Sequence, residues 1–192
     1  MHILKANIKA LSGGTEAEVQ QIWTALTPLD LAKDQFILQP PQICWRYYFI
    51  EHGAVRLYYR KEHKDYTAWI GTQGQIFTEL DSYLHEQACQ YYLQAIEPSR
   101  VLTIAKTDSD ELARQLPAYN TLLRKTVEMA FVHITRNIVA FQSEAASERY
   151  DRLENEKNWL TRFPLKYLSS FLGITQSSLS RLRANREKMR KP

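Results

Sequence analysis

The stretch FPLKYLSSFLGITQSSLSRLR, residues 163–183, decides how the C-terminal quarter of the chain folds. Pro164 favours the start of a short helix, because its fixed backbone suits the first turn. Gly173 supplies the permissive backbone that a tight turn needs, and Thr175 is a good cap for a second helix. This order of helix, turn and capped helix predicts a helix-turn-helix.

The two helices of this stretch have an apolar side and a polar side. The apolar side can close a small core, formed by Leu168, Leu172, Ile174, Leu179 and Leu182. Small hydrogen-bonding side chains with an arginine on the opposite face suit insertion into a major groove, whereas a plain helical hairpin with a solvated face is the alternative. We predict that the DNA-contacting residues are Lys166, Thr175, Gln176, Ser177, Ser178, Ser180, Arg181 and Arg183.

The charge of the chain is unevenly distributed. The formal net charge is +4, yet residues 1–144 carry 14 basic against 16 acidic side chains. Residues 145–192 carry 11 basic against 5 acidic side chains. Such asymmetry favours a polyanionic partner for the C-terminal part, for which double-stranded DNA is the candidate, although a basic end can also be merely solvated.

A long helix is expected immediately before this part, from about residue 117 to residue 143. Its apolar stripe consists of Leu123, Val127, Ala130, Ile134 and Phe141, and a second apolar set, Leu122, Met129, Val132 and Val139, lies on other faces. A helix that is apolar on more than one side must bury more than one side. We therefore expect a homodimer formed through the first stripe, with a helix buried inside one domain as the alternative.

Residues 29–106 have the pattern of an antiparallel β domain. Short runs rich in aromatic and β-branched residues are separated by turn signals, which is typical of a sandwich or barrel. The expected strands are residues 36–38, 47–50, 55–59, 67–70, 91–96 and 101–104. A capping box that starts at Thr15 predicts a helix over residues 15–26, and Thr107 with Asp110 offers another helix start.

Several classes of protein are disfavoured by the sequence. The longest uncharged run, Tyr167–Ser180, is too short and too polar to span a bilayer, and the first residues do not resemble a secretory signal, so we expect a cytoplasmic location without membrane contact. Cys44 and Cys89 lie outside any metal or disulfide spacing and are read as small buried hydrophobes. The histidines lack the spacing of a cupin metal site, so neither an enzyme nor a metal or other cofactor is expected.

The order of parts resembles the Crp/Fnr superfamily of transcription regulators, in a short-ended subgroup. The similarity rests on residues 48–59 (YFIEHGAVRLYY), on residues 71–77 (GTQGQIF) and on the C-terminal stretch quoted above. It implies an α+β fold with an N-terminal antiparallel β-roll, or double-stranded β-helix. The implied parts are a cyclic-nucleotide-binding-like effector domain at 1–116, a dimerisation helix at 117–143 and a DNA-binding helix-turn-helix domain at 144–192. RNA polymerase is a candidate partner on the same grounds.

The sequence departs from this family in two places. The effector pocket implied by the resemblance contains Gly74, Thr78, Glu79, Leu80, Cys89 and Gln90. Cys89 and Gln90 stand where members that bind cyclic AMP carry an arginine followed by serine or threonine, and a buried phosphate without a charge partner is costly. We therefore expect another small effector or none, with a cyclic-nucleotide-responsive regulator as the alternative.

The second departure is the missing wing. Only nine residues follow Arg183, too few for the β-hairpin that usually follows the recognition helix. The basic tail, which contains Arg186, Lys188, Arg190 and Lys191, is expected to contact phosphates in its place.

One further alternative for the whole chain remains. It is an effector-binding or dimerisation module whose helix-turn-helix has degenerated and does not bind DNA.

Overall fold

The computed structural model describes residues 2–154 and 158–190. Its helices are α1 (Ile3–Ser12), α2 (Glu16–Thr24), α3 (Leu80–His85), α4 (Lys106–Gln115), α5 (Pro117–Ser143), α6 (Ala146–Glu154), α7 (Trp159–Arg162), α8 (Leu165–Leu172) and α9 (Gln176–Arg190). Its strands are β1 (Thr27–Leu31), β2 (Phe36–Leu38), β3 (Arg46–His52), β4 (Ala54–Lys61), β5 (Lys64–Thr72), β6 (Ile76–Phe77), β7 (Tyr92–Ala95) and β8 (Ser99–Ala105).

The strands form two antiparallel four-stranded sheets that face each other. One sheet has the order β1-β8-β3-β6 and the other β2-β7-β4-β5. Along β4, Val55 and Leu57 point between the sheets, whereas Arg56 and Tyr58 point to the outer face, as the two-residue period of a strand requires. The predicted β-roll is confirmed.

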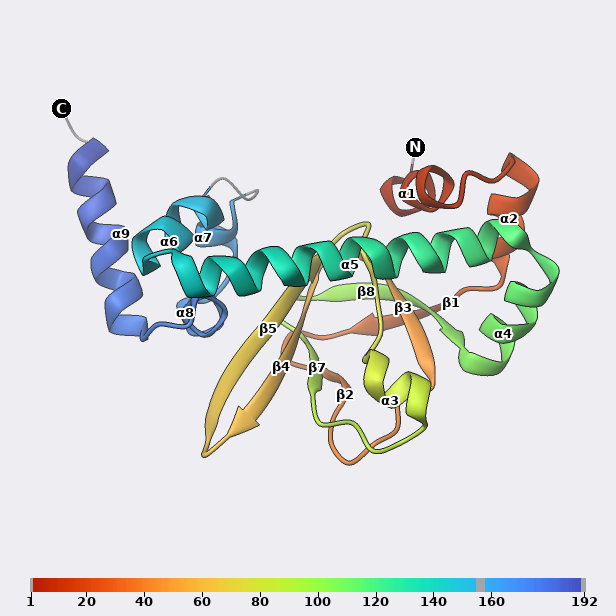
Figure 1. The fold of residues 1–192 in the computed structure, drawn as a ribbon, viewed down its shortest axis with the longest axis horizontal. Coiled ribbons are helices and arrows are strands. Elements are labelled where there is room, and N and C mark those ends of the chain that lie inside the picture. The colour runs from red at the N-terminus through yellow and green to blue at the C-terminus, as the bar shows by residue number, and fades with distance from the viewer. Residues whose placement is uncertain (1, 155–157, 191–192) are drawn as a thin grey trace.

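The long helix α5 begins and ends where the sequence predicts. Pro117 lies in its first turn, where the missing amide hydrogen costs nothing. Tyr119 and Leu122 are fully buried against the roll, but the C-terminal half of α5 runs past it (Figure 1). Figure 1 also places α1, α2 and α4 at one end of α5 and α6–α9 at the other.

Other expectations hold in part. Thr15 and Glu18 form the predicted capping box at the start of α2. Helix α4 begins at Lys106 with Ala105 as its cap, so Thr107 does not cap it. The amphipathic pattern of residues 147–159 predicts a single helix over this range, and this prediction is wrong, because α6 ends at Glu154 and a separate helix, α7, begins at Trp159 after Asn158 in the left-handed conformation. Helix α1, which no sequence signal predicted, packs Leu4 and Ile8 into the core.

Cys44 and Cys89 are both buried and unbridged, as expected. No helix of the described residues is long and apolar enough to cross a bilayer.

Candidate DNA-binding surface and effector site

The segment α8–turn–α9 forms a helix-turn-helix. Gly173 closes α8 in the left-handed conformation, with φ 70°. The Thr175 hydroxyl accepts a hydrogen bond from the Ser178 amide at 3.2 Å, which is the predicted cap of α9. The five predicted core side chains lie in one hydrophobic cluster together with Tyr150, Leu153, Trp159, Phe163 and Tyr167.

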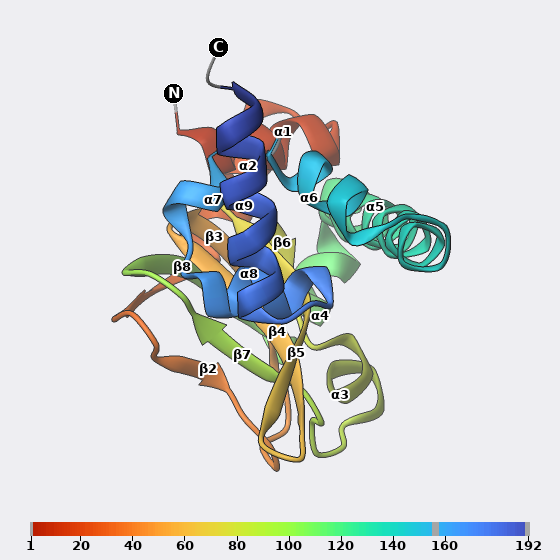
Figure 2. The ribbon, with the colours of Figure 1, turned by 90° about the vertical axis from the view of Figure 1, so that its left-hand side faces the viewer.

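The polar face of α9 points away from this core. Gln176, Ser177, Ser180 and Arg181 are exposed, and Figure 2 shows α9 standing at the outside of the molecule. Two more of the predicted DNA contacts, Lys166 and Thr175, are exposed as well. Ser178 and Arg183 are half-buried, and Arg183 pairs with Glu187 at 3.3 Å. The structure thus places most of the predicted residues in the first two turns of α9 or at its cap, with Lys166 in the first turn of α8.

The basic tail lies only partly within the described residues. Arg186 forms an ion pair with Asp151 of α6, and Lys188 is exposed. Lys191 and the side chain of Arg190 lie outside the described residues, so the phosphate contacts expected of the tail stay a prediction.

The helix-turn-helix is fastened to the β-roll of the same chain. The Ser170 hydroxyl accepts a hydrogen bond from the Thr67 amide at 2.8 Å and donates one to the Asp65 carbonyl at 2.7 Å. The guanidinium of Arg162 pairs with Glu97 and donates to the Gly53 carbonyl. Ala54, Ile70 and Ile96 of the β-roll belong to the same hydrophobic cluster as the apolar residues of α6–α9. The outer face of the roll therefore contributes to the hydrophobic core of the C-terminal helices.

A buried arginine stands at this junction. Arg56 is 3% exposed; it donates to Asp65 at 2.8 Å and to Gln94 at 2.7 and 3.0 Å. Its guanidinium lies between two rings, 3.7 Å from the centroid of Tyr58 on β4 and 4.2 Å from that of Tyr167 on α8. Arg56 therefore connects β4 and β5 to α8 through direct contacts.

The predicted dimerisation stripe of α5 is largely uncovered. Val127, Ile134 and Phe141 are 40%, 56% and 50% exposed, and Leu123 is half-buried. Ala130 is exposed too, as are further apolar residues of the same half of the helix: Met129, Phe131, Val132, Ile138 and Val139. Phe141 also touches the C-terminal part, where the Arg149 guanidinium lies 4.8 Å from its ring centroid. An exposed apolar patch of this kind marks an interaction surface.

The predicted effector residues are brought together only in part. Thr78, Glu79 and Cys89 gather around Cys44 and Ser82, where Thr78 contacts the Cys44 thiol at 3.3 Å. Glu79 caps α3 by accepting the Ser82 amide at 2.9 Å; its burial raises the pKa of the carboxyl. Burial likewise raises the pKa of the Cys89 thiol to about 11.

The other three predicted effector residues lie apart from this cluster. Leu80 and Gln90 are exposed, and the Gly74 carbonyl accepts a hydrogen bond from Asn7 of α1 at 3.2 Å. The assignment of an effector pocket to these six residues therefore stays a prediction.

Aromatic rings fill the interior of the roll beside β6. Tyr48 stacks on Phe77 with ring centroids 5.2 Å apart, and Phe77 lies 5.3 Å from Trp69. The Trp69 indole covers Gly71 so closely that a Cβ on Gly71 would lie 1.8 Å from its Cη2 atom. This part of the roll is occupied by the chain's own side chains.

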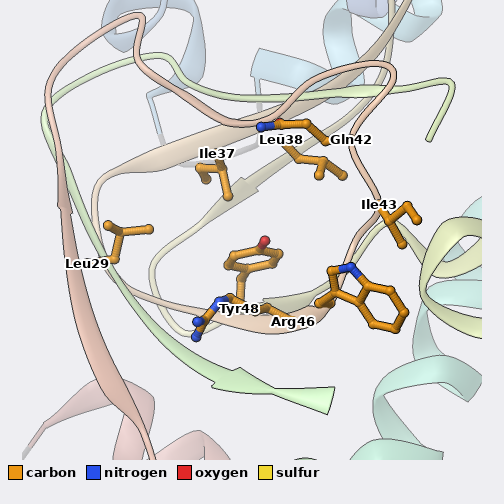
Figure 3. Close-up of a pocket in the computed structure, with 8 residues that line it drawn as sticks. Leu29, Ile37, Leu38, Gln42, Ile43, Arg46 and Tyr48 are labelled. Atoms are coloured by element: carbon orange, nitrogen blue, oxygen red, sulfur yellow. The ribbon is translucent and has the colours of Figure 1, made fainter. Parts of the chain in front are cut away.

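An open cavity of about 520 Å³ lies on the other side of Tyr48, between β1, β2, β3 and the loop before β3. It is lined by Leu29, Ile37, Leu38, Gln42, Ile43, Trp45, Arg46 and Tyr48. Figure 3 shows the Tyr48 hydroxyl pointing into the space that these side chains surround. None of the six predicted effector residues is among those that line it.

The comparisons with known proteins agree with this architecture. Residues 28–115 match the family model of the cyclic nucleotide-binding domain. FixK2 from Bradyrhizobium japonicum is 16% identical over 85% of this chain and 85% of its own, with a TM-score of 0.75. A CooA mutant from Carboxydothermus hydrogenoformans is 17% identical over 94% of this chain and 84% of its own, with a TM-score of 0.72.

A third solved structure carries the family name. It is described as a transcriptional regulator of the crp/fnr family from Eubacterium rectale and is 12% identical over 88% of this chain and 82% of its own, with a TM-score of 0.69. The chain has the fold of the Crp/Fnr regulators. A search of curated proteins by sequence found no match.

Sequence reasoning missed two features of this Crp/Fnr fold. The docking of α8 on the roll rests on Arg56, whose burial nothing in the local pattern indicates. The cavity is built from residues of β1, β2 and β3 that the sequence places in the β domain without assigning them a site.

Proposed function

We propose that the chain is a DNA-binding transcriptional regulator of the Crp/Fnr type, a homodimer that binds a near-palindromic operator. The observation that carries the proposal is the exposed polar face of α9, held in place by the Gly173 turn and the Thr175 cap. Gln176, Ser177 and Arg181 on this face have the side chains that read base edges in a major groove.

The dimer is supported by α5. Many apolar side chains in the C-terminal half of α5 are exposed to solvent. Ile134, which is 56% exposed, lies in the middle of the predicted dimerisation stripe. Pairing two such helices would bury the stripe and bring two copies of α9 to one side of the assembly. The operator should then have half-site centres about 34 Å apart, one helical turn of DNA.

We propose a separate role for each of the three parts of the chain. We assign effector sensing to residues 1–116, dimerisation to 117–143 and DNA binding to 144–192. The hydrogen bonds between Ser170 and β5 support a direct coupling of the first part to the third. Contact with RNA polymerase belongs to the same proposal.

A cyclic-nucleotide-responsive regulator is the second candidate, favoured by the family match of residues 28–115. Two observations argue against it: Cys89 and Gln90 stand in place of the arginine and the serine or threonine that bind the phosphate, and three rings fill the roll beside β6. Calorimetry with cyclic AMP decides between the two, because a dissociation constant in the low micromolar range would establish the second candidate.

The experiment that tests the main proposal is selection of bound fragments from random DNA by the full chain, followed by fluorescence anisotropy. We expect an inverted repeat to be enriched. Recovery of no sequence, with equal affinity for all duplexes, would leave an effector-binding or dimerisation module with a degenerate DNA head as the better description.

A further inference from the structure

The cavity between β1, β2 and β3 combines apolar walls with one uncompensated positive charge. Its apolar lining consists of Leu29, Ile37, Leu38, Ile43 and the Trp45 indole. Its size lies within the usual range of small-molecule sites, which are mostly apolar with a few polar groups that fix orientation.

The positive charge belongs to Arg46. Within the described part of the chain, Arg46 takes part in no ion pair, and its guanidinium donates one hydrogen bond, to the Thr103 hydroxyl at 3.2 Å. A guanidinium carries five N–H donors in a fixed fork, so most of its donors are free to bind an anion. That fork matches a carboxylate, which it can hold through two parallel hydrogen bonds.

Two neutral polar groups complete the lining. The Tyr48 hydroxyl points into the cavity (Figure 3), and burial raises the pKa of this phenol, so it stays protonated and can donate. Gln42 adds an amide at the rim. A nucleotide would need several partners for its ribose hydroxyls and its base edges, more than one hydroxyl and one amide at the rim supply, whereas a flat apolar body with a single carboxylate fits this set.

We propose that this cavity binds a small aromatic monocarboxylate, with its ring between the aliphatic side chains and the Trp45 indole and its carboxylate on Arg46. As the effector site of a regulator, the inference rests on the function proposed above; as a binding site, it stands on the cavity alone. Tyr48, through its stacking on Phe77, joins the cavity to the interior of the roll.

The test is calorimetry on the full chain with 2-naphthoate and, as its uncharged counterpart, 2-naphthamide. We expect one naphthoate to bind per chain, more tightly than the amide. Arg46→Gln should weaken naphthoate at least tenfold and leave the amide unchanged. Leu29→Trp, which fills the cavity, should weaken both ligands, and Lys33→Gln, which removes an exposed charge outside the lining, should change neither.

Three results would overturn the proposal: no binding of naphthoate at millimolar concentration, binding that neither Arg46→Gln nor Leu29→Trp weakens, or displacement of naphthoate by cyclic AMP. Thermal unfolding of the variants shows whether each is folded, and Arg46→Gln, a change at an exposed side chain, keeps the test valid should Leu29→Trp not fold. Affinity for the selected operator is measured on the same samples. Binding of naphthoate without binding of the operator would contradict the proposed function alone. Binding of the operator without binding of naphthoate would contradict the effector site alone.

Discussion

Phe141, near the end of α5, lies against the turn at Gly173: a Cβ atom on Gly173 would come within 2.9 Å of the Phe141 Cε1 atom. The guanidinium of Arg149 in α6 lies 4.8 Å from the centroid of the same ring. The last turns of α5 therefore touch the turn that sets the direction of α9. If two copies of α5 pair as proposed, a change in that pairing would alter the contacts at this turn, next to the proposed DNA-binding surface.

Replacing Gly173 with alanine should destabilise the chain, because φ 70° strains a side chain by about 1–2 kcal/mol and because the Phe141 ring must move. Gly13→Ala is the matched control, since Gly13 has φ 66° and no atom within 4 Å of the added Cβ. We expect Gly173→Ala to cost at least about 0.5 kcal/mol more, with Phe141→Ala removing the excess in the double variant. Equal losses in urea unfolding would show that Phe141 does not restrain the turn.

Arg56 and Arg60 share Asp65 but differ in burial, and this pair tests the junction between the roll and α8. Arg56→Ala should cost about 1–3 kcal/mol, because it leaves the buried side-chain oxygen of Gln94 without its donor and removes the guanidinium that contacts two rings, while Asp65 keeps Arg60. Arg60→Ala should cost about 0–1 kcal/mol, because its side chain is 43% exposed. Similar costs for the two variants would contradict the junction described here.

The same carboxylate predicts a dependence of stability on pH. Burial opposes the charge of Asp65, but hydrogen bonds from Arg60 and Arg56 outweigh it and lower its pKa. The stabilisation is therefore present above the unfolded value of about 4 and is lost as the pH falls through the lower folded value. Asp65→Asn should be less stable than the wild type at pH 6, and the difference should shrink below about pH 4. A difference that stays constant over this range would rule out the ion pair as its source.

Ile134→Asp should convert the dimer to a monomer, because it places a carboxylate in an apolar seam. Thr135→Asp is the control, since the next residue lies about 100° further around the helix. Sedimentation velocity at micromolar concentration should give a dimer for the wild type and for the control. A monomeric wild type would count against the assigned role of α5.

The sequence predicts what depends on local pattern and misses what depends on contacts between distant parts. Strand β2 has the expected bounds, Phe36–Leu38, and the Gly173 turn and the Thr175 cap lie where expected, because each has a strong local signal. No sequence signal predicted helix α1, since the residue at its N-cap position, His2, makes no side-chain hydrogen bond to the backbone of the helix.

The junction and the cavity could not be predicted for the same physical reason. Arg56 alternates with Val55 and Leu57 as a solvent-facing residue should, yet contacts with Gln94, with Asp65 and with Tyr167 of α8 bury it. Leu29, Ile37 and Arg46 belong to three different strands whose register no local pattern specifies. Contacts between segments that are distant in the sequence, and not local propensities, create both sites.

The measurement that tests the central claim most directly is fluorescence anisotropy of the wild type and Arg181→Ala on the selected operator and on random DNA, over a range of salt concentrations. The account predicts that Arg181→Ala loses about 1–3 kcal/mol on the operator and little on random DNA, because its guanidinium reads a base pair. The control variant, with Lys188, Arg190 and Lys191 replaced by alanine, should weaken both DNAs alike and lower the salt slope by about 0.9 per lost phosphate contact. Equal losses on the two DNAs for Arg181→Ala would contradict the assignment of the exposed face of α9 as the surface that reads the operator.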